Sequence, residues 1–332
     1  RRHTRFRNVT GVQTCALPIC IAGADVLPLA DGGEGTLDVL VAGLGGSLRT
    51  ERVTGPSGNE VSAQWAMLPG GTAVVEMARA SGHALVVGAP DALHATTRGT
   101  GELIAAALRA GARSVIVGVG GSATTDGGLP ALDALRWSFG SVPVVVACDV
   151  TTTFCDAARV YGPQKGATPA QIELLTRRLD TLAATYAQRT GVDVTTIDGS
   201  GAAGGLAGGL AAIGATLEPG FDVVADAVGL DDRLEAGCDL LVTGEGALDA
   251  TSLEGKVVAG AIDAARAHDV EHIAVVCGRA DPDVRAQLEA AGVIVCTLVE
   301  RAWDADDAMA RASLLCEEAG LDLARRVVSA GR

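Results

Sequence analysis

Lysine is almost absent from this sequence of 332 residues. Only Lys165 and Lys256 occur, against 24 arginines, and acidic residues outnumber basic ones by 40 to 26. The resulting net charge of −14 repels phosphate backbones and anionic lipid, so the composition argues against nucleic acid and membrane as partners. An anionic substrate must therefore be bound by a few local donors and not by the overall field.

Long apolar runs and CxxC pairs are also missing. No stretch approaches the roughly 20 apolar residues that a membrane-spanning helix needs. The eight cysteines form no CxxC pair, which argues against a cysteine-rich zinc site. Cys148, Cys277 and Cys296 stand in apolar runs, as buried reduced thiols do, which favours a cytoplasmic protein. Residues 1–20 superficially resemble a secretion signal, but Pro18 interrupts their apolar part.

Short β-branched runs alternate with Ala- and Leu-rich segments, which is the pattern of βα units around a mostly parallel sheet. We expect strands at Ala24–Pro28, Ala73–Met77, Ser114–Val119, Val142–Ala147, Leu240–Thr243, Ile273–Cys277 and Val293–Leu298. We expect helices at Glu102–Ala110, Pro169–Arg189, Val257–His268 and Asp304–Val328, with Thr168 as an N-cap.

The alternation of strand-like and helix-like segments predicts an α/β protein of two domains. Turn residues at 54–58 lie between two alternating stretches and indicate an antiparallel hairpin. Residues 48–222 therefore form an inserted mixed α/β domain in this interpretation. Residues 21–47 and 223–332 share the regular βα texture and are expected to build one Rossmann-like domain with a mostly parallel sheet from both chain ends.

Four clusters of glycine and acidic or hydroxyl residues follow or neighbour the predicted strands. They cover residues 30–36, 120–128, 199–205 and 243–249. Loops at the carboxyl ends of parallel strands line the ligand crevice, and glycine lets backbone N–H groups approach phosphate oxygens. Each cluster alone is an ordinary turn more often than a site, but the four together favour a phosphate-handling site.

Both lysines stand beside glycine, in Gln164-Lys165-Gly166 and Gly255-Lys256-Val257. A chain that otherwise uses arginine suggests, by keeping lysine here, that a compact ammonium must contact a phosphate. Two leftover surface lysines are the alternative explanation.

Two familiar nucleotide motifs do not fit. The P-loop pattern fails because Ala250 and Val257 replace its first glycine and its hydroxyl residue. Residues 118–123 match the G-x-G-x-x-A dinucleotide fingerprint, but the sequence from Thr124 to Pro130 cannot open a regular amphipathic helix. A nicotinamide enzyme is therefore disfavoured.

As a set, several stretches resemble the bacterial glycerate kinase family. They follow the family's order from about residue 21 to the C-terminus and cover residues 28–36, 99–104, 120–128, 147–150, 162–167, 201–205, 242–249 and 253–256. The resemblance implies two α/β domains, Mg²⁺ and ATP, and phosphorylation of glycerate, with 2-phosphoglycerate as the favoured product. A kinase of another small hydroxy or sugar acid is the alternative enzyme, and the resemblance leaves a homodimer open.

The resemblance also suggests roles for individual residues. Asp31 or Asp126 would act as the catalytic proton acceptor. Lys165 and Lys256 would act as catalytic cations that neutralise the phosphate charge. The metal would be held by Asp149, Glu245 and Asp249. The loop residues that would bind the nucleotide phosphates or the substrate carboxylate are Gly120, Gly121, Ser122, Thr124, Gly244 and Gly246.

Two regions depart from the family pattern. Residues 1–20 match nothing of the family's opening strand and its Asp-Ser-Phe-Lys-Gly loop, so we expect them to be foreign to it. Residues 136–141 replace a longer connection. An inactive nucleotide-binding remnant is the alternative that these departures leave open.

Overall fold

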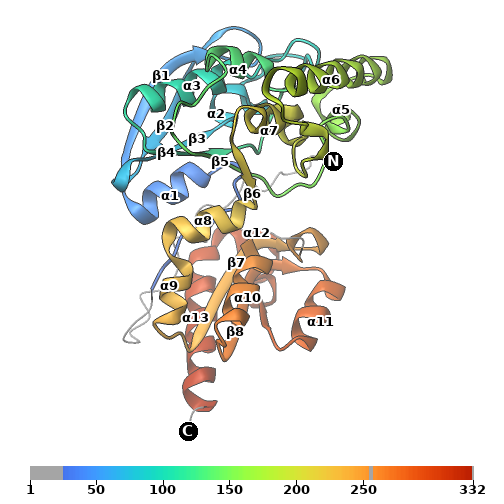
Figure 1. Ribbon diagram of the computed structural model, residues 1–332. Coiled ribbons are helices and arrows are strands. Elements are labelled where there is room, and N and C mark those ends of the chain that lie inside the picture. The colour runs from blue at the N-terminus through green and yellow to red at the C-terminus, as the bar shows by residue number, and fades with distance from the viewer. Residues whose placement is uncertain (1–24, 254–256, 331–332) are drawn as a thin grey trace. The chain divides into compact units, whose positions relative to one another are not determined.

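The computed structural model describes residues 25–253 and 257–330, and the chain divides into two compact units. The larger unit runs from Ala30 to Val224, and the smaller one joins the described residues up to Leu29 with those from Ala225 on. This division groups residues 30–47 with the larger unit, whereas the sequence analysis grouped them with the C-terminal residues. Both units combine helices with parallel strands (Figure 1), so the mixed α/β class predicted from the sequence is confirmed.

The larger unit is built on a six-stranded sheet whose strands are neighbours in chain order. The strands are β1 (Ser47–Thr54), β2 (Glu60–Met67), β3 (Thr72–Glu76), β4 (Ser114–Gly118), β5 (Val144–Ala147) and β6 (Thr216–Glu218). The first three strands are antiparallel, and β3 to β6 are parallel. The hairpin expected around residues 54–58 is confirmed, because Val53 pairs with Val61 on either side of the turn.

Helices cover both faces of this sheet. They are α1 (Thr36–Leu44), α2 (Ala78–Ser81), α3 (Arg98–Arg109), α4 (Leu129–Ala134), α5 (Ala157–Tyr161), α6 (Pro169–Thr190), α7 (Ala202–Ala212) and α8 (Gly220–Val228), of which α8 continues into the smaller unit. Ala73 and Val75 of β3 belong to the main core, which also takes residues from α3, α4, α6 and α7. Figure 1 shows α1 on the opposite face. Because side chains alternate along a strand, Val74 and Glu76 point away from the main core.

Helix α6 shows how local sequence sets an element's ends. The hydroxyl of Thr168 accepts a hydrogen bond from the backbone N–H of Gln171, the Gln171 side chain accepts one from Thr168, and Pro169 occupies the first turn. Gly191 ends the helix in the left-handed conformation, with φ of 79°. The predicted N-cap at Thr168 is confirmed.

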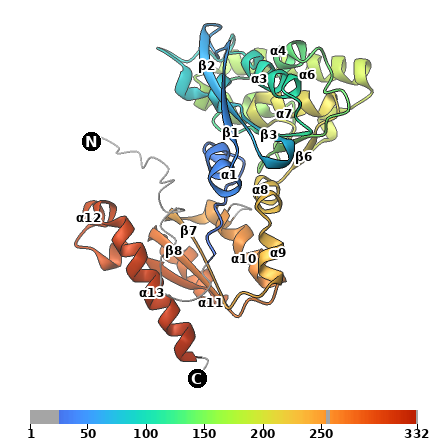
Figure 2. The same cartoon turned by 90° about the vertical axis from the view of Figure 1, so that its left-hand side faces the viewer.

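The smaller unit has a three-stranded parallel sheet in the order β7 (Leu240–Leu248), β8 (His272–Ala280) and β9 (Ile294–Thr297). Its helices are α9 (Leu230–Glu235), α10 (Val257–Ala267), α11 (Pro282–Ala290), α12 (Ala305–Ala310) and α13 (Ala312–Ala330), several of which are seen from a second side in Figure 2. Ala274 and Val276 of β8 pack against Leu315 and Leu323 of α13 to form a core of their own.

Two predicted elements are wrong in detail. No strand forms over residues 25–28, although the run is apolar, and Val26 is 45% exposed. A strand needs a partner for its backbone hydrogen bonds, and Pro28 has no N–H to donate. The single helix expected over 304–328 is broken at Arg311 into α12 and α13. The sequence analysis placed no element at strand β6 or at helices α1, α2, α4, α5, α7, α8, α9 and α11.

No helix among the described residues is long and apolar enough to cross a membrane. The six cysteines in the described part of the chain are free thiols. Cys277 is buried as predicted, whereas Cys148 and Cys296 are only half-buried.

Candidate functional site

The glycine-rich loop Asp31–Gly35 lies directly against the carboxyl ends of the parallel strands of the larger unit. A Cβ atom placed on Gly32 would come within 2.8 Å of the Cβ of Ala147, the last residue of β5. A Cβ on Gly118, the last residue of β4, would come within 2.7 Å of the Gly32 carbonyl oxygen. These approaches need glycine, so the loop composition read in the sequence is explained by close packing of backbone on backbone.

Two carboxylates lie near the point where this loop crosses the strand ends. Asp149 follows β5, and its Oδ1 accepts a hydrogen bond of 2.6 Å from the backbone N–H of Gly220. Burial raises the pKa of Asp149 to about 6, and the negative charge of Asp31 contributes in the same direction, against the lowering effect of the Gly220 hydrogen bond. Asp31 itself accepts a hydrogen bond of 3.1 Å from the Gly33 N–H. The structure therefore brings two of the predicted site residues together.

Lys165 is the second feature of the site. Its side chain is 2% exposed, and its Nζ donates hydrogen bonds to the Ser122 hydroxyl at 3.2 Å and to the Thr124 carbonyl oxygen. Burial lowers the pKa of Lys165 to about 8, and the charge of Asp126 opposes this shift. The loop after β4 thus binds a buried ammonium from a residue more than 40 positions further along the chain. This loop contains Gly120, Gly121, Ser122 and Thr124.

The hydrogen bonds of Asp126 give this residue a structural role. Its Oδ2 accepts hydrogen bonds from the Thr97 backbone N–H at 2.7 Å and hydroxyl at 2.9 Å, and its Oδ1 accepts one from the Gly128 N–H at 3.0 Å. Burial raises the pKa of Asp126, and these hydrogen bonds act against the rise. Because Thr97 immediately precedes α3, Asp126 fixes the start of that helix and its two oxygens are both occupied.

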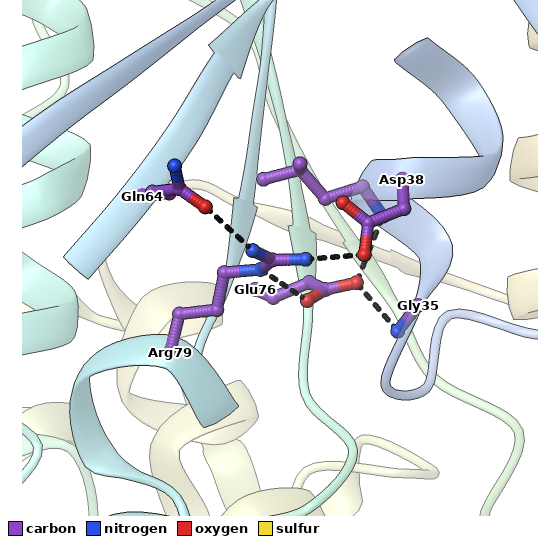
Figure 3. Close-up of polar contacts among 6 residues, drawn as sticks. Gly35, Asp38, Gln64, Glu76 and Arg79 are labelled. Atoms are coloured by element: carbon purple, nitrogen blue, oxygen red, sulfur yellow. Dashed lines mark hydrogen bonds and ion pairs between the residues drawn. The ribbon is translucent and has the colours of Figure 1, made fainter. Parts of the chain in front are cut away.

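Sequence reasoning missed Glu76 and Arg79. Glu76 is 3% exposed, and its Oε1 accepts hydrogen bonds of 2.8 Å from the backbone N–H groups of Gly35 and Leu37 (Figure 3). Its Oε2 accepts one of 2.8 Å from Arg79 Nε. The sequence did contain a signal for Glu76, because it is a lone carboxylate at the end of an apolar strand. A charge that is buried in such a run must be paired with a hydrogen-bond donor or a cation.

The smaller unit holds the other predicted site residues. Gly244, Glu245 and Gly246 lie within β7, and Asp249 follows its end. The Oδ1 of Asp249 accepts hydrogen bonds from the Thr251 backbone N–H at 2.9 Å and hydroxyl at 2.7 Å. Burial raises the pKa of Cys277 to about 12, and the neighbouring charge of Glu245 adds to this rise. Lys256 lies outside the described residues.

The predicted site residues are therefore divided between the units. Asp31, Gly120, Gly121, Ser122, Thr124, Asp126, Asp149 and Lys165 belong to the larger unit, and Gly244, Glu245, Gly246 and Asp249 to the smaller one. Within residues 25–253 and 257–330, no group of three or more His, Cys, Asp or Glu side chains has the arrangement of a metal site. The expectation that the four glycine-rich clusters form one phosphate-handling site stays a prediction.

Comparison with known proteins gives a consistent result. Residues 10–142 and 136–328 match the model of the glycerate kinase family. The chain is 39% identical over 276 residues to the glycerate 2-kinase of Escherichia coli K12, covering 72% of each chain. It is 36% identical over 343 residues to the glycerate kinase of Bacillus subtilis 168, covering 92% of this chain and 89% of the relative.

A solved structure is also similar. The crystal structure of a Salmonella typhimurium LT2 protein provisionally named glycerate kinase 2 superposes with a TM-score of 0.77 at 33% identity, covering 92% of this chain and 89% of that one. The two matched segments overlap at residues 136–142, which include the connection at 136–141 that the sequence predicted to be shortened. The segment 1–20 that we expected to be foreign lies outside the described residues, and the family match begins at residue 10.

Proposed function

Because this chain belongs to the glycerate kinase family, we propose that it transfers a phosphoryl group from ATP to a hydroxyl group of glycerate. Beyond the family, one observation carries the proposal: the loop that carries Asp31 packs against Ala147 at the end of β5, two residues before Asp149. Phosphoryl transfer needs positioned carboxylates and cations rather than a covalent nucleophile, and this unit supplies both.

Asp31 is the proposed proton acceptor for the glycerate hydroxyl. The alternative, Asp126, has both carboxylate oxygens engaged by Thr97 and Gly128. Asp31 uses one oxygen within its own loop, for Gly33. A general base needs an accessible lone pair within hydrogen-bond reach of the substrate proton, which favours Asp31.

Lys165 is the proposed cation for the transferred phosphate. Its ammonium is held by Ser122 and by the Thr124 carbonyl, in a loop whose glycines Gly120 and Gly121 would let phosphate or carboxylate oxygens approach the backbone. Keeping a buried ammonium charged is unfavourable unless an anion joins it, which is the situation that a bound phosphate creates. Lys256 is proposed to act in the same way from the sequence pattern.

A divalent cation fits the donor set at Asp149. Its half-buried carboxylate is a hard oxygen ligand, and a positive ion would offset the repulsion from Asp31 that contributes to its raised pKa. We propose that Asp149 helps to hold Mg²⁺, which would neutralise charge on the phosphates, and the metal-ligand roles of Glu245 and Asp249 stay predictions from the sequence. We further propose that the smaller unit is Rossmann-like, and that Gly244 and Gly246 in the second half of β7 bind ATP there.

The product and the surroundings of the reaction are also proposals. We favour the 2-hydroxyl as acceptor, and the free thiols of the described residues suit the reducing cytoplasm. Assembly of two copies of this chain into a homodimer stays a prediction.

The experiment is an ADP-release assay on the purified chain with ATP, Mg²⁺ and D-glycerate, each omitted in turn. We expect release only when all three are present, and phosphorus NMR of the product identifies the phosphorylated hydroxyl. Asp31→Asn should lower kcat on the order of 10²-fold or more, as loss of a general base does. The matched control Asp263→Asn, at an exposed carboxylate of α10, should be silent.

Two results would contradict the assignment. Turnover with another hydroxy or sugar acid but not with glycerate would move the enzyme to the alternative substrate class. ATP binding without any turnover across the panel would identify a nucleotide-binding remnant.

A further inference from the structure

The N-terminus of helix α1 is closed by a carboxylate from a distant strand. Its N-cap residue, Gly35, provides no side-chain cap. Glu76, 41 residues further along the chain, takes over this role by accepting the N–H groups of Gly35 and Leu37, each at 2.8 Å (Figure 3). Free N–H groups at a helix start attract anions, and here a protein carboxylate already accepts hydrogen bonds from two of them.

Glu76 is itself held in place. Arg79 donates through Nε to Glu76 at 2.8 Å, and its two terminal nitrogens donate to Asp38 of α1 at 2.7 Å and to Gln64 of β2 at 3.2 Å. One guanidinium thus ties together strand β2, the end of β3 and helix α1. Such a bridging arginine restricts the rotamers of the carboxylate that it contacts.

The closed helix start determines what the loop Asp31–Gly35 can offer to a substrate. One end of the loop is anchored through Gly35 to Glu76, and its middle is pressed against the strand ends at Gly32 and Ala147. The N–H groups of Gly35 and Leu37 at the helix start are used by Glu76, which disfavours phosphate binding there despite the glycine-rich sequence of the loop. What it presents instead is the carboxylate of Asp31, beside Asp149.

We propose that Glu76 is a positioning residue that occupies the anion site of α1 and thereby holds Asp31 in place for the reaction. This inference rests on the proposed function for its kinetic consequences. Displacement of a reacting group by about 1 Å can lower the rate on the order of 10²-fold, so removal of Glu76 should affect kcat strongly. Because Glu76 contacts no substrate in this scheme, KM should change little.

The test compares Glu76→Ala and the isosteric Glu76→Gln with the control Glu60→Gln, which removes a charge from an exposed ion pair with Arg52 on the same sheet. We expect kcat of Glu76→Ala to fall on the order of 10²-fold at nearly unchanged KM. Added formate should restore part of the lost kcat in a saturable manner, because it can refill the vacated anion site, and chloride should not. Glu76→Gln should fold normally and lose less kcat than Glu76→Ala but more than the control.

Binding of formate can be measured without turnover. Calorimetric titration should show saturable formate binding to Glu76→Ala and none to the wild-type chain. If the wild-type chain phosphorylates nothing, the proposed function fails, and this titration still decides whether Glu76 occupies an anion site. A folded Glu76→Gln variant with the kcat of the wild type, or a Glu76→Ala variant that binds no formate, overturns the inference.

Discussion

Lys165→Met should separate catalysis from stability. Met replaces the ammonium by a neutral side chain of similar length in a site that is 2% exposed. Burial lowers the pKa of Lys165 from 10.5 to about 8, which corresponds to about 3 kcal/mol of cost for keeping the charge buried at neutral pH. The substitution removes that cost but also removes the hydrogen bonds that Lys165 donates to the Thr124 carbonyl oxygen and the Ser122 hydroxyl, a loss of about 1–3 kcal/mol.

These opposing effects predict a small net change in the free energy of unfolding, within about 2 kcal/mol of zero at pH 7. Activity should behave differently, because loss of one preorganised charge at the transition state lowers the rate on the order of 10²-fold or more. Urea denaturation followed by circular dichroism, and kcat/KM from ADP release, measure the two quantities on the same preparations. Arg177→Met, at an exposed arginine of α6, is the matched control and should change neither.

The pH dependence of unfolding gives an independent check. The pKa of Lys165 is lower in the folded chain than in the unfolded one, so the unfolded chain binds more protons between about pH 8 and 10.5. The stabilisation is present above the unfolded pKa and is lost as pH falls through the folded pKa. Wild-type stability should therefore rise relative to Lys165→Met across this window, by up to about 3 kcal/mol.

Two outcomes would refute the reasoning. Parallel pH profiles for the two proteins would show that the pKa of Lys165 is not lowered. A destabilisation of more than about 4 kcal/mol at pH 7 would show that Lys165 is a structural anchor whose removal leaves uncompensated buried groups.

Further predictions concern caps, glycines and acid dependence. Thr168→Ala should destabilise the chain by about 1 kcal/mol in urea denaturation, because it removes the capping box of α6, and an unchanged midpoint would contradict that role. Gly204→Ala should lower the free energy of unfolding by about 3 kcal/mol or more, because φ is +67° and a Cβ would collide with the Thr124 carbonyl oxygen. Gly191→Ala has a similar φ of +79° but open space around the Cβ, so it should lower that free energy by only about 1–2 kcal/mol. Equal losses for the two variants would refute the steric argument. Because the pKa of Asp149 is about 6, kcat/KM should fall about tenfold per pH unit below that value, and a flat profile down to pH 5 would exclude Asp149 as an essential carboxylate.

The sequence by itself determined the elements whose signals are local. The β-branched runs at 73–77, 114–119 and 273–277 became strands, and Thr168 with Pro169 set the start of α6. These signals survive because periodicity and capping act within a few residues. The motif set was sufficient to indicate the family, which the comparisons then confirmed.

Only the tertiary structure decided which partner each polar group meets. Asp126 and Asp31 look alike in their glycine-rich loops, yet Asp126 is used by Thr97, 29 residues away, to start α3. Glu76 carries no motif, and its role depends on N–H groups 39 and 41 residues distant. The apolar run at 25–28 forms no strand, because a strand exists only where a second strand supplies hydrogen bonds. Side-chain type and spacing are written in the chain, but pairing between distant segments is set by how the whole core packs.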